Sequence, residues 1–251
     1  MIRSLRQAAL LPFAAVPILL SGCQSAGAGG VADAAPLPQI EVRLDATKKI
    51  QVGFLVLDGV YGSELIGPHD VLQHTIFHAD PGMQVFTIGR THDEVRTFEG
   101  LHLRPDFSLA DAPKIDVLVV PSAEHNLDTD LEDQELIDWV RLRGQEARYV
   151  MSLCDGAFVL AQAGLLEGHA CTTFPGDLDK FAERFPDHDL RRGPIVVVDR
   201  NTITNVGGAR SYDPAMLLVE ILYGRKAALG IAGGLVLDWR YDPEQHEIVA
   251  P

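Results

Sequence analysis

The sequence predicts an α/β domain built around a mostly parallel β-sheet. Segments 50–57, 115–120 and 149–153 are apolar at nearly every position, which is typical of strands covered on both faces. Stretches with helical periodicity separate these segments, and such alternation indicates parallel strands joined by crossover helices. Residues 150–160 run from a strand through Cys154 directly into a helical pattern. Ligands of such sheets bind beyond the carboxyl ends of the strands, where this cysteine is placed.

The first 22 residues have the layout of an export signal. Arg3 and Arg6 precede an apolar run over residues 8–20, which is too short for a comfortable membrane span. Residues 20–23, Leu-Ser-Gly-Cys, resemble the lipobox of bacterial lipoproteins, in which Cys23 carries acyl chains such as palmitate. The alternative is an ordinary cleavage site next to an incidental cysteine. The lipobox predicts a lipid-anchored protein of the bacterial cell envelope, and Gln24 favours the outer membrane or periplasm if the cell is Gram-negative.

A flexible tether and one compact domain are expected after the signal. Residues 23–47 begin with a tract rich in Ala, Gly and Pro that lacks hydrophobic periodicity, as linkers do. Residues 48–251 suffice for one domain with its own core. The formal charge is −14, and loss of the two arginines in the signal makes it −16. This acidity argues against nucleic acid or anionic lipid as a partner, so we expect a small-molecule substrate or ligand and a membrane contact through the lipid anchor only.

The first half of the domain is expected to contain three strands, a helix and a hairpin. Continuous apolar runs predict strands at residues 50–57, 84–88 and 115–120. Gly67-Pro68 predicts the start of a helix over residues 70–79, because proline is tolerated in a first turn. Residues 95–103 predict a hairpin around Glu99-Gly100.

The second half continues the alternation. Apolar residues at helical spacing predict a helix over residues 130–144, and a buried strand follows at 149–153. The next helix covers 155–163 and ends at Gly164, a residue type that commonly terminates helices. A short helix at 178–185, paired strands at 195–199 and 202–205, and a helix at 214–223 complete the prediction.

Cys154 is the candidate nucleophile. A thiol at the start of a helix faces N–H groups and the positive end of the helix dipole, which favour the thiolate. The alternative is a buried structural cysteine, since free cysteines are among the most buried residues. A disulfide with Cys171 is disfavoured, because the two cysteines are placed in different strand patterns. No cysteine or histidine spacing is typical of a metal site, so neither a metal nor a cofactor is expected.

Several motifs, in order along the chain, resemble the ThiJ/PfpI family of the class I glutamine amidotransferase-like fold. They are Asp58-Gly59-Val60, Glu64-Leu65-Ile66-Gly67-Pro68, Asp70-Val71-Leu72, the strand at 115–121, Cys154-Asp155-Gly156-Ala157-Phe158, Ala163-Gly164-Leu165-Leu166 and Thr172-Thr173. The resemblance covers nearly all of residues 48–251. It implies a flavodoxin-like three-layer sandwich, frequently dimeric, so a homodimer is expected. It also implies that Glu64 hydrogen-bonds the Cys154 thiol.

The proximity of these two groups would couple their protonation. A carboxyl beside a thiolate is pushed toward its neutral form, from which it can donate a hydrogen bond to sulfur. The pair would then share one proton. The same reading predicts an oxyanion pocket from the backbone N–H groups of Asp155, Ser122 and Ala123.

Three departures from the family pattern bear on activity. Family members that carry a histidine near the cysteine have it after the paired threonines, where this chain has Phe174. Pro121-Ser122-Ala123 stands in place of the usual Pro-Gly-Gly, and the charged Asp155 follows the cysteine. His125, on the turn after the third strand, is an auxiliary candidate, although surface loop histidines are ordinary.

The predicted function is an enzyme whose Cys154 attacks a small electrophilic carbon while Glu64 donates and accepts the proton. Within the family, a cysteine and an acid without a required histidine most resemble isonitrile hydratase, a lyase that adds water to isocyanides, and hydrolase-like chemistry is closely related. The alternative is a non-catalytic envelope protein that binds a small ligand or senses oxidants through Cys154.

Overall fold

The computed structural model describes residues 35–38 and 45–249. The export signal and Cys23 lie outside these residues. The strands of the main sheet are β1 (Gln51–Leu55), β2 (Gln84–Gly89), β5 (Phe107–Ser108), β6 (Val117–Val120), β7 (Tyr149–Leu153), β10 (Val196–Asp199), β11 (Thr202–Asn205) and β12 (His246–Val249). Two small sheets pair β3 (Val95–Arg96) with β4 (His102–Leu103) and β8 (Ala170–Cys171) with β9 (Asp189–Leu190).

The helices complete the element order. They are α1 (Gly62–Gln73), α2 (Thr129–Glu132), α3 (Gln134–Glu146), α4 (Gly156–Gln162), α5 (Leu178–Arg184), α6 (Tyr212–Tyr223) and α7 (Arg225–Leu235), with short 3-10 helices η2 (His74–Phe77), η3 (Pro175–Asp177) and η4 (Gly208–Ser211).

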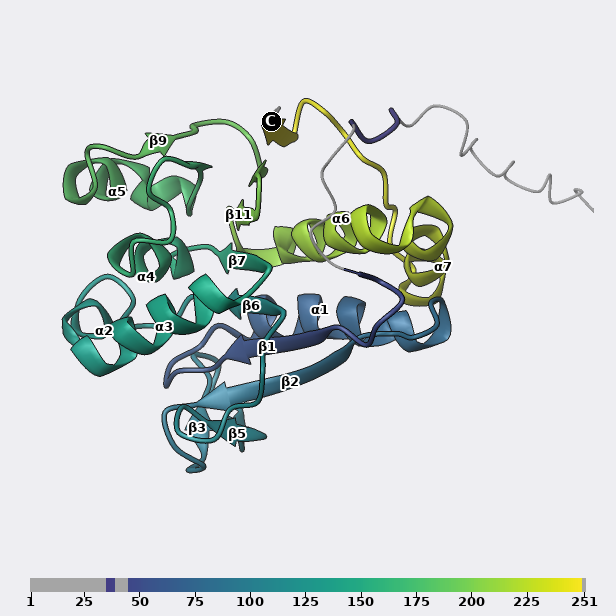
Figure 1. The fold of residues 1–251 in the computed structure, drawn as a ribbon. Helices are drawn as coiled ribbons and strands as arrows, with labels where there is room; N and C mark the ends of the chain where they lie inside the picture. The colour runs from purple at the N-terminus through teal and green to yellow at the C-terminus, as the bar shows by residue number, and fades with distance from the viewer. Residues whose placement is uncertain (1–34, 39–44, 250–251) are drawn as a thin grey trace, which may run out of the picture. The chain divides into compact units, whose positions relative to one another are not determined.

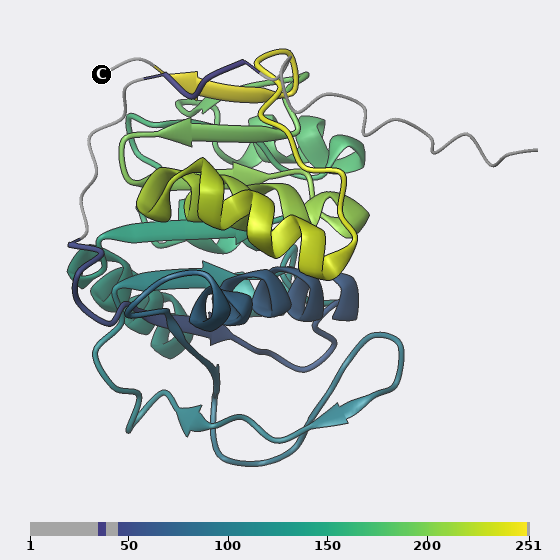
Figure 2. The ribbon, with the colours of Figure 1, turned by 90° about the vertical axis from the view of Figure 1, so that its right-hand side faces the viewer.

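The main sheet is mostly parallel and lies between two helical layers. Its strand order is β12-β10-β11-β7-β6-β1-β2-β5, and the β10–β11 pair alone is antiparallel among these described strands. Helices α1, α6 and α7 cover one face, and α2, α3 and α4 cover the other (Figure 1). Figure 2 shows the first of these layers in front of the strands. The predicted α/β class and three-layer arrangement are confirmed.

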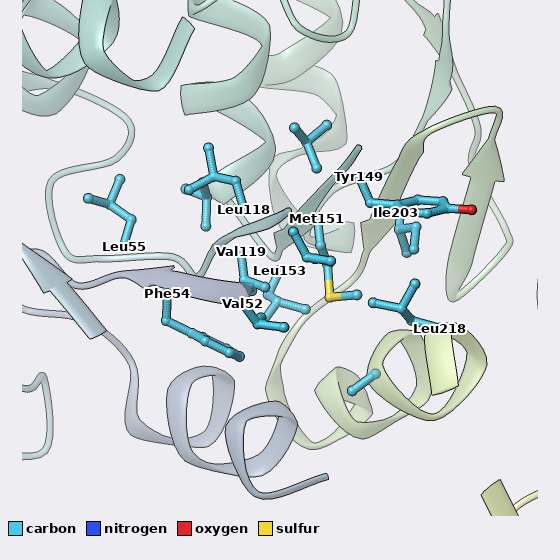
Figure 3. Close-up of a cluster of buried hydrophobic side chains, with 14 of the residues drawn as sticks. Val52, Phe54, Leu55, Leu118, Val119, Tyr149, Met151, Leu153, Ile203 and Leu218 are labelled. Carbon is cyan, nitrogen blue, oxygen red and sulfur yellow. The ribbon is translucent and has the colours of Figure 1, made fainter. Parts of the chain in front are cut away.

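The core explains why the central strands are apolar at every position. Along β1, Val52 and Phe54 lie on one face of the sheet and Leu55 lies on the other, and all three are buried. Figure 3 shows these side chains leaving opposite faces of the sheet, with Met151 and Leu218 in the same cluster. Because both faces are covered by helices, neither set of side chains meets water.

Two predicted helices have different boundaries in the structure. Helix α1 begins at Gly62 rather than near Pro68, because both carboxylate oxygens of Glu99 accept the Gly62 N–H at 3.0 Å and so satisfy a free donor of the first turn. The predicted helix at 130–144 is divided at Asp133, whose carboxylate accepts the Leu136 N–H at 3.0 Å and caps α3. The antiparallel pairing of β3 with β4 and of β10 with β11 confirms the two predicted hairpins. Helix α7 and strand β12 were not predicted.

Candidate active site

Cys154 lies on a strained turn between β7 and α4. Its φ of 53° places it in the left-handed region, which costs a non-glycine residue about 1–3 kcal/mol. The backbone is held there from two sides: the Cys154 N–H donates to the Asn205 carbonyl at 2.9 Å, and the Thr173 hydroxyl donates to the Cys154 carbonyl at 3.0 Å. The surrounding fold therefore holds the Cys154 backbone in this strained conformation.

Glu64 approaches this turn from the first turn of α1. Its side chain is 3 % exposed, and its two oxygens accept three hydrogen bonds. Oε2 accepts from the N–H and hydroxyl of Ser122, at 3.0 and 2.7 Å, and Oε1 accepts from the Gly208 N–H at 3.0 Å. Both partners of Glu64 are far from it in the sequence, so tertiary structure alone builds this carboxyl site.

The backbone of Gly207 lies where Glu64 and Cys154 meet. A Cβ at residue 207 would lie 2.4 Å from the Cys154 Cβ and 2.8 Å from the Glu64 Oε1. Its φ of +86° also favours glycine. The structure thus places the cysteine and the acid near each other at the carboxyl end of the sheet. The hydrogen bonds of the Glu64 carboxylate in the described residues go to Ser122 and Gly208, so the bond to the Cys154 thiol that the resemblance implied is not among them.

The thiol is more buried than the sequence suggested. Cys154 is 8 % exposed, and burial, followed by the nearby carboxyls of Glu64 and Asp155, raises its pKa. Hydrogen bonds from the Ser122 side chain and the Asp155 N–H act in the opposite direction but are outweighed. The expectation of a thiolate favoured by the helix end is therefore wrong for this resting arrangement. Helix α4 spans only seven residues, and its dipole does not offset the loss of solvent around sulfur.

The prediction of an oxyanion pocket is also wrong for two of its three backbone N–H donors. The Ser122 N–H donates to Glu64, and the Ala123 N–H donates to the Asn126 Oδ1 at 2.8 Å, so neither is free to bind a developing oxyanion. The Asp155 N–H remains directed at the sulfur. Asn126, fully buried and bonded to Asp130 through its Nδ2 at 2.9 Å, was not singled out by sequence. Its position in the sequence, after a turn residue, did not indicate that its side chain would accept the Ala123 N–H.

Asp155, on the turn between β7 and α4, lies near a second carboxyl group, that of Asp177. Burial, then the charge of Asp177, raises the pKa of Asp155 to about 7. The Thr173 hydroxyl lies 3.2 Å from the Asp155 Oδ1, and Lys180 is ion-paired with Asp177 at 2.5 Å. With a pKa of about 7, Asp155 is partly protonated at neutral pH, which reduces the negative charge that it places beside the sulfur.

An aromatic pair lies close to the reactive groups. Tyr61 stacks on Phe98 with ring centroids 4.6 Å apart. Burial, then the charges of Cys154 and Glu64, raises the pKa of the Tyr61 phenol, so its hydroxyl is within electrostatic reach of both. Phe98 lies at the tip of the β3–β4 hairpin, which Glu99 fastens to α1. The hairpin was predicted, but its contribution to the site was not.

Phe174 occupies the position at which some family members carry a histidine, and His125 does not take the place of that histidine. His125 is exposed and pairs with Asp128, Nδ1 to Oδ1, at 3.3 Å. It lines a cavity of about 360 Å³ together with Asp58, Arg90 and other residues. The structure gives it no bond to Cys154 or Glu64 within the described residues. Phe174 is 43 % exposed.

Metal and disulfide chemistry find no site in the described part of the chain. No group of three or more His, Cys, Asp or Glu side chains there could hold a metal ion. Cys154 and Cys171 are both free thiols. No helix within residues 35–38 and 45–249 has the length and apolar character needed to cross a bilayer.

Comparisons with known proteins agree with this architecture. The model of the DJ-1/PfpI family matches residues 50–220. Isonitrile hydratase of Pseudomonas putida is 34 % identical over 182 residues, which are 70 % of this chain and 73 % of the relative. The HTH-type transcriptional regulator GbdR of Pseudomonas aeruginosa is 23 % identical over 79 % of this chain, but the match spans only 53 % of the regulator.

Solved structures show the same fold. The crystal structure of DJ-1beta from Drosophila melanogaster has a TM-score of 0.66 at 23 % identity and covers 76 % of this chain and 100 % of that one. A ThiJ/PfpI family protein from Pseudomonas syringae has a TM-score of 0.67 at 24 % identity and covers 82 % and 84 % of the two chains.

Proposed function

The chain belongs to the DJ-1/PfpI family, and on that premise we propose that it is an isonitrile hydratase-like enzyme with Cys154 as nucleophile and Glu64 as proton carrier. The observation that carries this proposal is the meeting of the two side chains at the Gly207 backbone, on a turn whose strained backbone the surrounding fold holds in place. The 34 % identity with an isonitrile hydratase supports the choice of substrate class.

The proposed reaction adds water to an isocyanide, R–N≡C, in two stages. The Cys154 thiol loses its proton as sulfur attacks the terminal carbon, and Glu64 accepts that proton and returns it to the same carbon. The product of this stage is a thioimidate, R–N=CH–S–Cys154. Water then adds across the C=N bond, its oxygen to carbon and one proton to nitrogen. Collapse of the adduct breaks the C–S bond, returns the hydroxyl proton to sulfur, and releases the formamide R–NH–CHO.

The burial of the thiol fits a nucleophile that is activated only during attack. With its pKa raised by burial and by Glu64, Cys154 rests as a thiol, and a base must remove the proton. Glu64 accepts hydrogen bonds on both oxygens, which suits that role. The stacked rings of Tyr61 and Phe98 offer an apolar surface for the organic group of the substrate.

Glu64→Gln is expected to lower kcat for an alkyl isocyanide by about 10²–10⁴-fold, the range contributed by a positioned acid or base. Glutamine has the same shape but can neither accept nor return the proton. Formamide formation, followed by NMR with purified protein, measures the effect. Glu94→Gln removes an exposed carboxylate that pairs with His102 and serves as the control. A Glu64→Gln variant within threefold of the unmutated rate would rule out Glu64 as the proton carrier.

A second candidate, a non-catalytic ligand-binding protein, is favoured by one observation, which argues against oxidant sensing because a sensor needs an accessible thiolate. A buried thiol with a raised pKa reacts slowly when nothing removes its proton. If the unmutated chain hydrates no member of an isocyanide panel but its melting temperature rises with a small electrophile, this candidate replaces the first.

We further propose that the chain is exported and lipid-anchored at Cys23. The support is the signal-like segment and the Leu-Ser-Gly-Cys sequence at residues 20–23. Cells that express the full chain should incorporate labelled palmitate into it, and Cys23→Ser should abolish the label. Labelling of the Cys23→Ser variant at an equal level would refute the anchor.

A further inference from the structure

Asn205 is the last residue of β11 and lies beside the strand that leads to Cys154. It is fully buried, and it pairs with Leu153 in the parallel register of β11 and β7. Its carbonyl oxygen accepts the Cys154 N–H at 2.9 Å. The backbone of Asn205 is therefore fixed relative to the proposed nucleophile.

The side chain of Asn205 bonds the loop that follows β11. Its Oδ1 accepts the Gly207 N–H at 2.8 Å, and its Nδ2 donates to the carbonyls of Ile195 and Arg210, at 3.0 and 3.2 Å. An amide group has one acceptor oxygen and two donor hydrogens, so both hydrogens are used. The reverse orientation of the amide would set its oxygen against two carbonyl oxygens. The three bonds therefore hold the side chain in one orientation.

The same loop reaches both proposed reactive groups. The Gly208 N–H donates to the Glu64 Oε1 at 3.0 Å, and a Cβ on Gly207 would lie 2.4 Å from the Cys154 Cβ. The two glycines have φ of +86° and +58°, and glycine loses more conformational freedom on folding than any other residue. A loop with two such residues needs bonds from outside to stay in one conformation. Its displacement would release one oxygen of the acid and open space beside the cysteine.

We propose that the Asn205 side chain is a positioning residue that fixes Glu64 relative to Cys154, and this proposal rests on the proposed function of that pair. The three hydrogen bonds of the side chain go to backbone atoms, so it acts through the loop. By holding Gly207, it keeps the Gly208 N–H on the carboxylate that must take the thiol proton. In the sequence, Asn205 is only the polar end of a predicted strand, which gave no indication of this role.

Asn205→Ala removes these three bonds and leaves the backbone bond to Cys154 in place. We expect kcat for an alkyl isocyanide to fall about 10–10²-fold, the range that a misplacement of about 1 Å costs a reacting group. KM should stay within about threefold, because the stacked rings of Tyr61 and Phe98 are unchanged. A loss of stability alone would not divide the effect between kcat and KM in this way.

Amide hydrogen exchange tests the loop without any substrate. It is measured by NMR on the full chain at neutral pH, at the amides of Gly207 and Gly208. Both amides are hydrogen-bonded in the structure, so both should exchange slowly in the unmutated chain. In Asn205→Ala both should exchange roughly tenfold faster or more, because the first loses its acceptor and the second is no longer held on Glu64.

Asn205→Ser is the conservative variant. A serine hydroxyl can accept the N–H two residues on, as an asparagine side chain does but more weakly, so the bond to Gly207 is retained in part. The bonds to Ile195 and Arg210 are lost. Both kcat and the exchange rates should lie between those of the unmutated chain and Asn205→Ala. If Asn205→Ala does not fold, Asn205→Ser decides the question by the same measurements.

Thr202→Val is the matched control. Thr202 begins the same strand, at the end of β11 away from the site, and is 1 % exposed. Its hydroxyl donates to the Asp199 carbonyl at 3.0 Å, so the variant also loses a buried hydrogen bond to a backbone oxygen. Its melting temperature should fall, whereas kcat should stay within about twofold and the exchange of Gly207 and Gly208 should not change.

The outcomes separate this role from the proposed function. Unchanged exchange at Gly207 and Gly208 in the Asn205 variants would overturn the proposal. An unchanged kcat in an active chain would also overturn it, as would equal losses in Thr202→Val. Faster exchange in Asn205→Ala, in a chain that hydrates no isocyanide, would support the hold of Asn205 on the loop while refuting the proposed reaction.

Discussion

Cys154→Ser is expected to reduce kcat/KM for isocyanide hydration by about 10³-fold or more, because a serine hydroxyl is a far weaker nucleophile than a thiol and is harder to deprotonate. Serine is close in size to cysteine, so the elbow should keep its shape. The rate of formamide formation measures the loss, and the melting temperature, expected within a few degrees of the unmutated chain, shows that the fold is retained.

Cys171→Ala is the control for this experiment. Cys171 is the other free thiol of the described residues and is fully buried in β8, where burial raises its pKa to about 12. Turnover and iodoacetamide labelling of the peptide that holds residue 154 should persist in Cys171→Ala and disappear in Cys154→Ser. Hydration by Cys154→Ser at more than a tenth of the unmutated rate would contradict the nucleophile assignment.

The position of the nucleophile could be predicted from the sequence because its determinants are local. An apolar run that ends in a cysteine and continues as a helical pattern indicates a strand-to-helix turn, and the structure places β7, Cys154 and α4 accordingly. The central strands could be predicted for the same reason, since residues buried on both faces are apolar at every position.

The protonation of the thiol could not be predicted, because its determinants are distant in the sequence. Gly208 binds Glu64 across 144 residues, and Ser122 binds it across 58. The Gly207 backbone, next to Gly208, lies close to the Cys154 Cβ, and burial is the largest cause of the raised pKa of Cys154. The hydrogen bond from the Asp155 N–H at the start of α4 lowers the thiol pKa, but burial outweighs it.

Two polar side chains near the site, Asn126 and Asp177, were also not predicted. The Asn126 side chain accepts a hydrogen bond from the Ala123 N–H. Asp177, in η3, lies near Asp155. In the sequence both are ordinary polar residues of a turn, and only the tertiary structure reveals their partners. The resemblance identified Glu64, but it could not indicate that Ser122, in place of the usual glycine, donates two hydrogen bonds to that carboxylate.

The largest effect on stability is expected at Gly156, the first residue of α4. A Cβ there would lie 2.0 Å from the Val120 carbonyl oxygen and 3.0 Å from the Val120 carbonyl carbon. Both are backbone atoms of the central strand β6, so no side chain can rotate away. Gly156→Ala must displace α4 from the sheet, which we expect to cost about 3 kcal/mol or more. Thermal unfolding should show a melting temperature lower by about 6–12 °C for a domain of this size.

Gly234→Ala provides the contrast, because residue 234 lies in α7 with open space around it. Alanine is a better helix former than glycine, so this variant should be as stable as the unmutated chain or more stable by up to about 1 kcal/mol. Since α4 begins two residues after Cys154, Gly156→Ala should also slow alkylation of the thiol by moving it relative to Glu64 and Ser122. A Gly156→Ala variant that melts within 2 °C of the unmutated chain, roughly the effect of 1 kcal/mol or less, would show that α4 does not pack against β6 as closely as the structure has it.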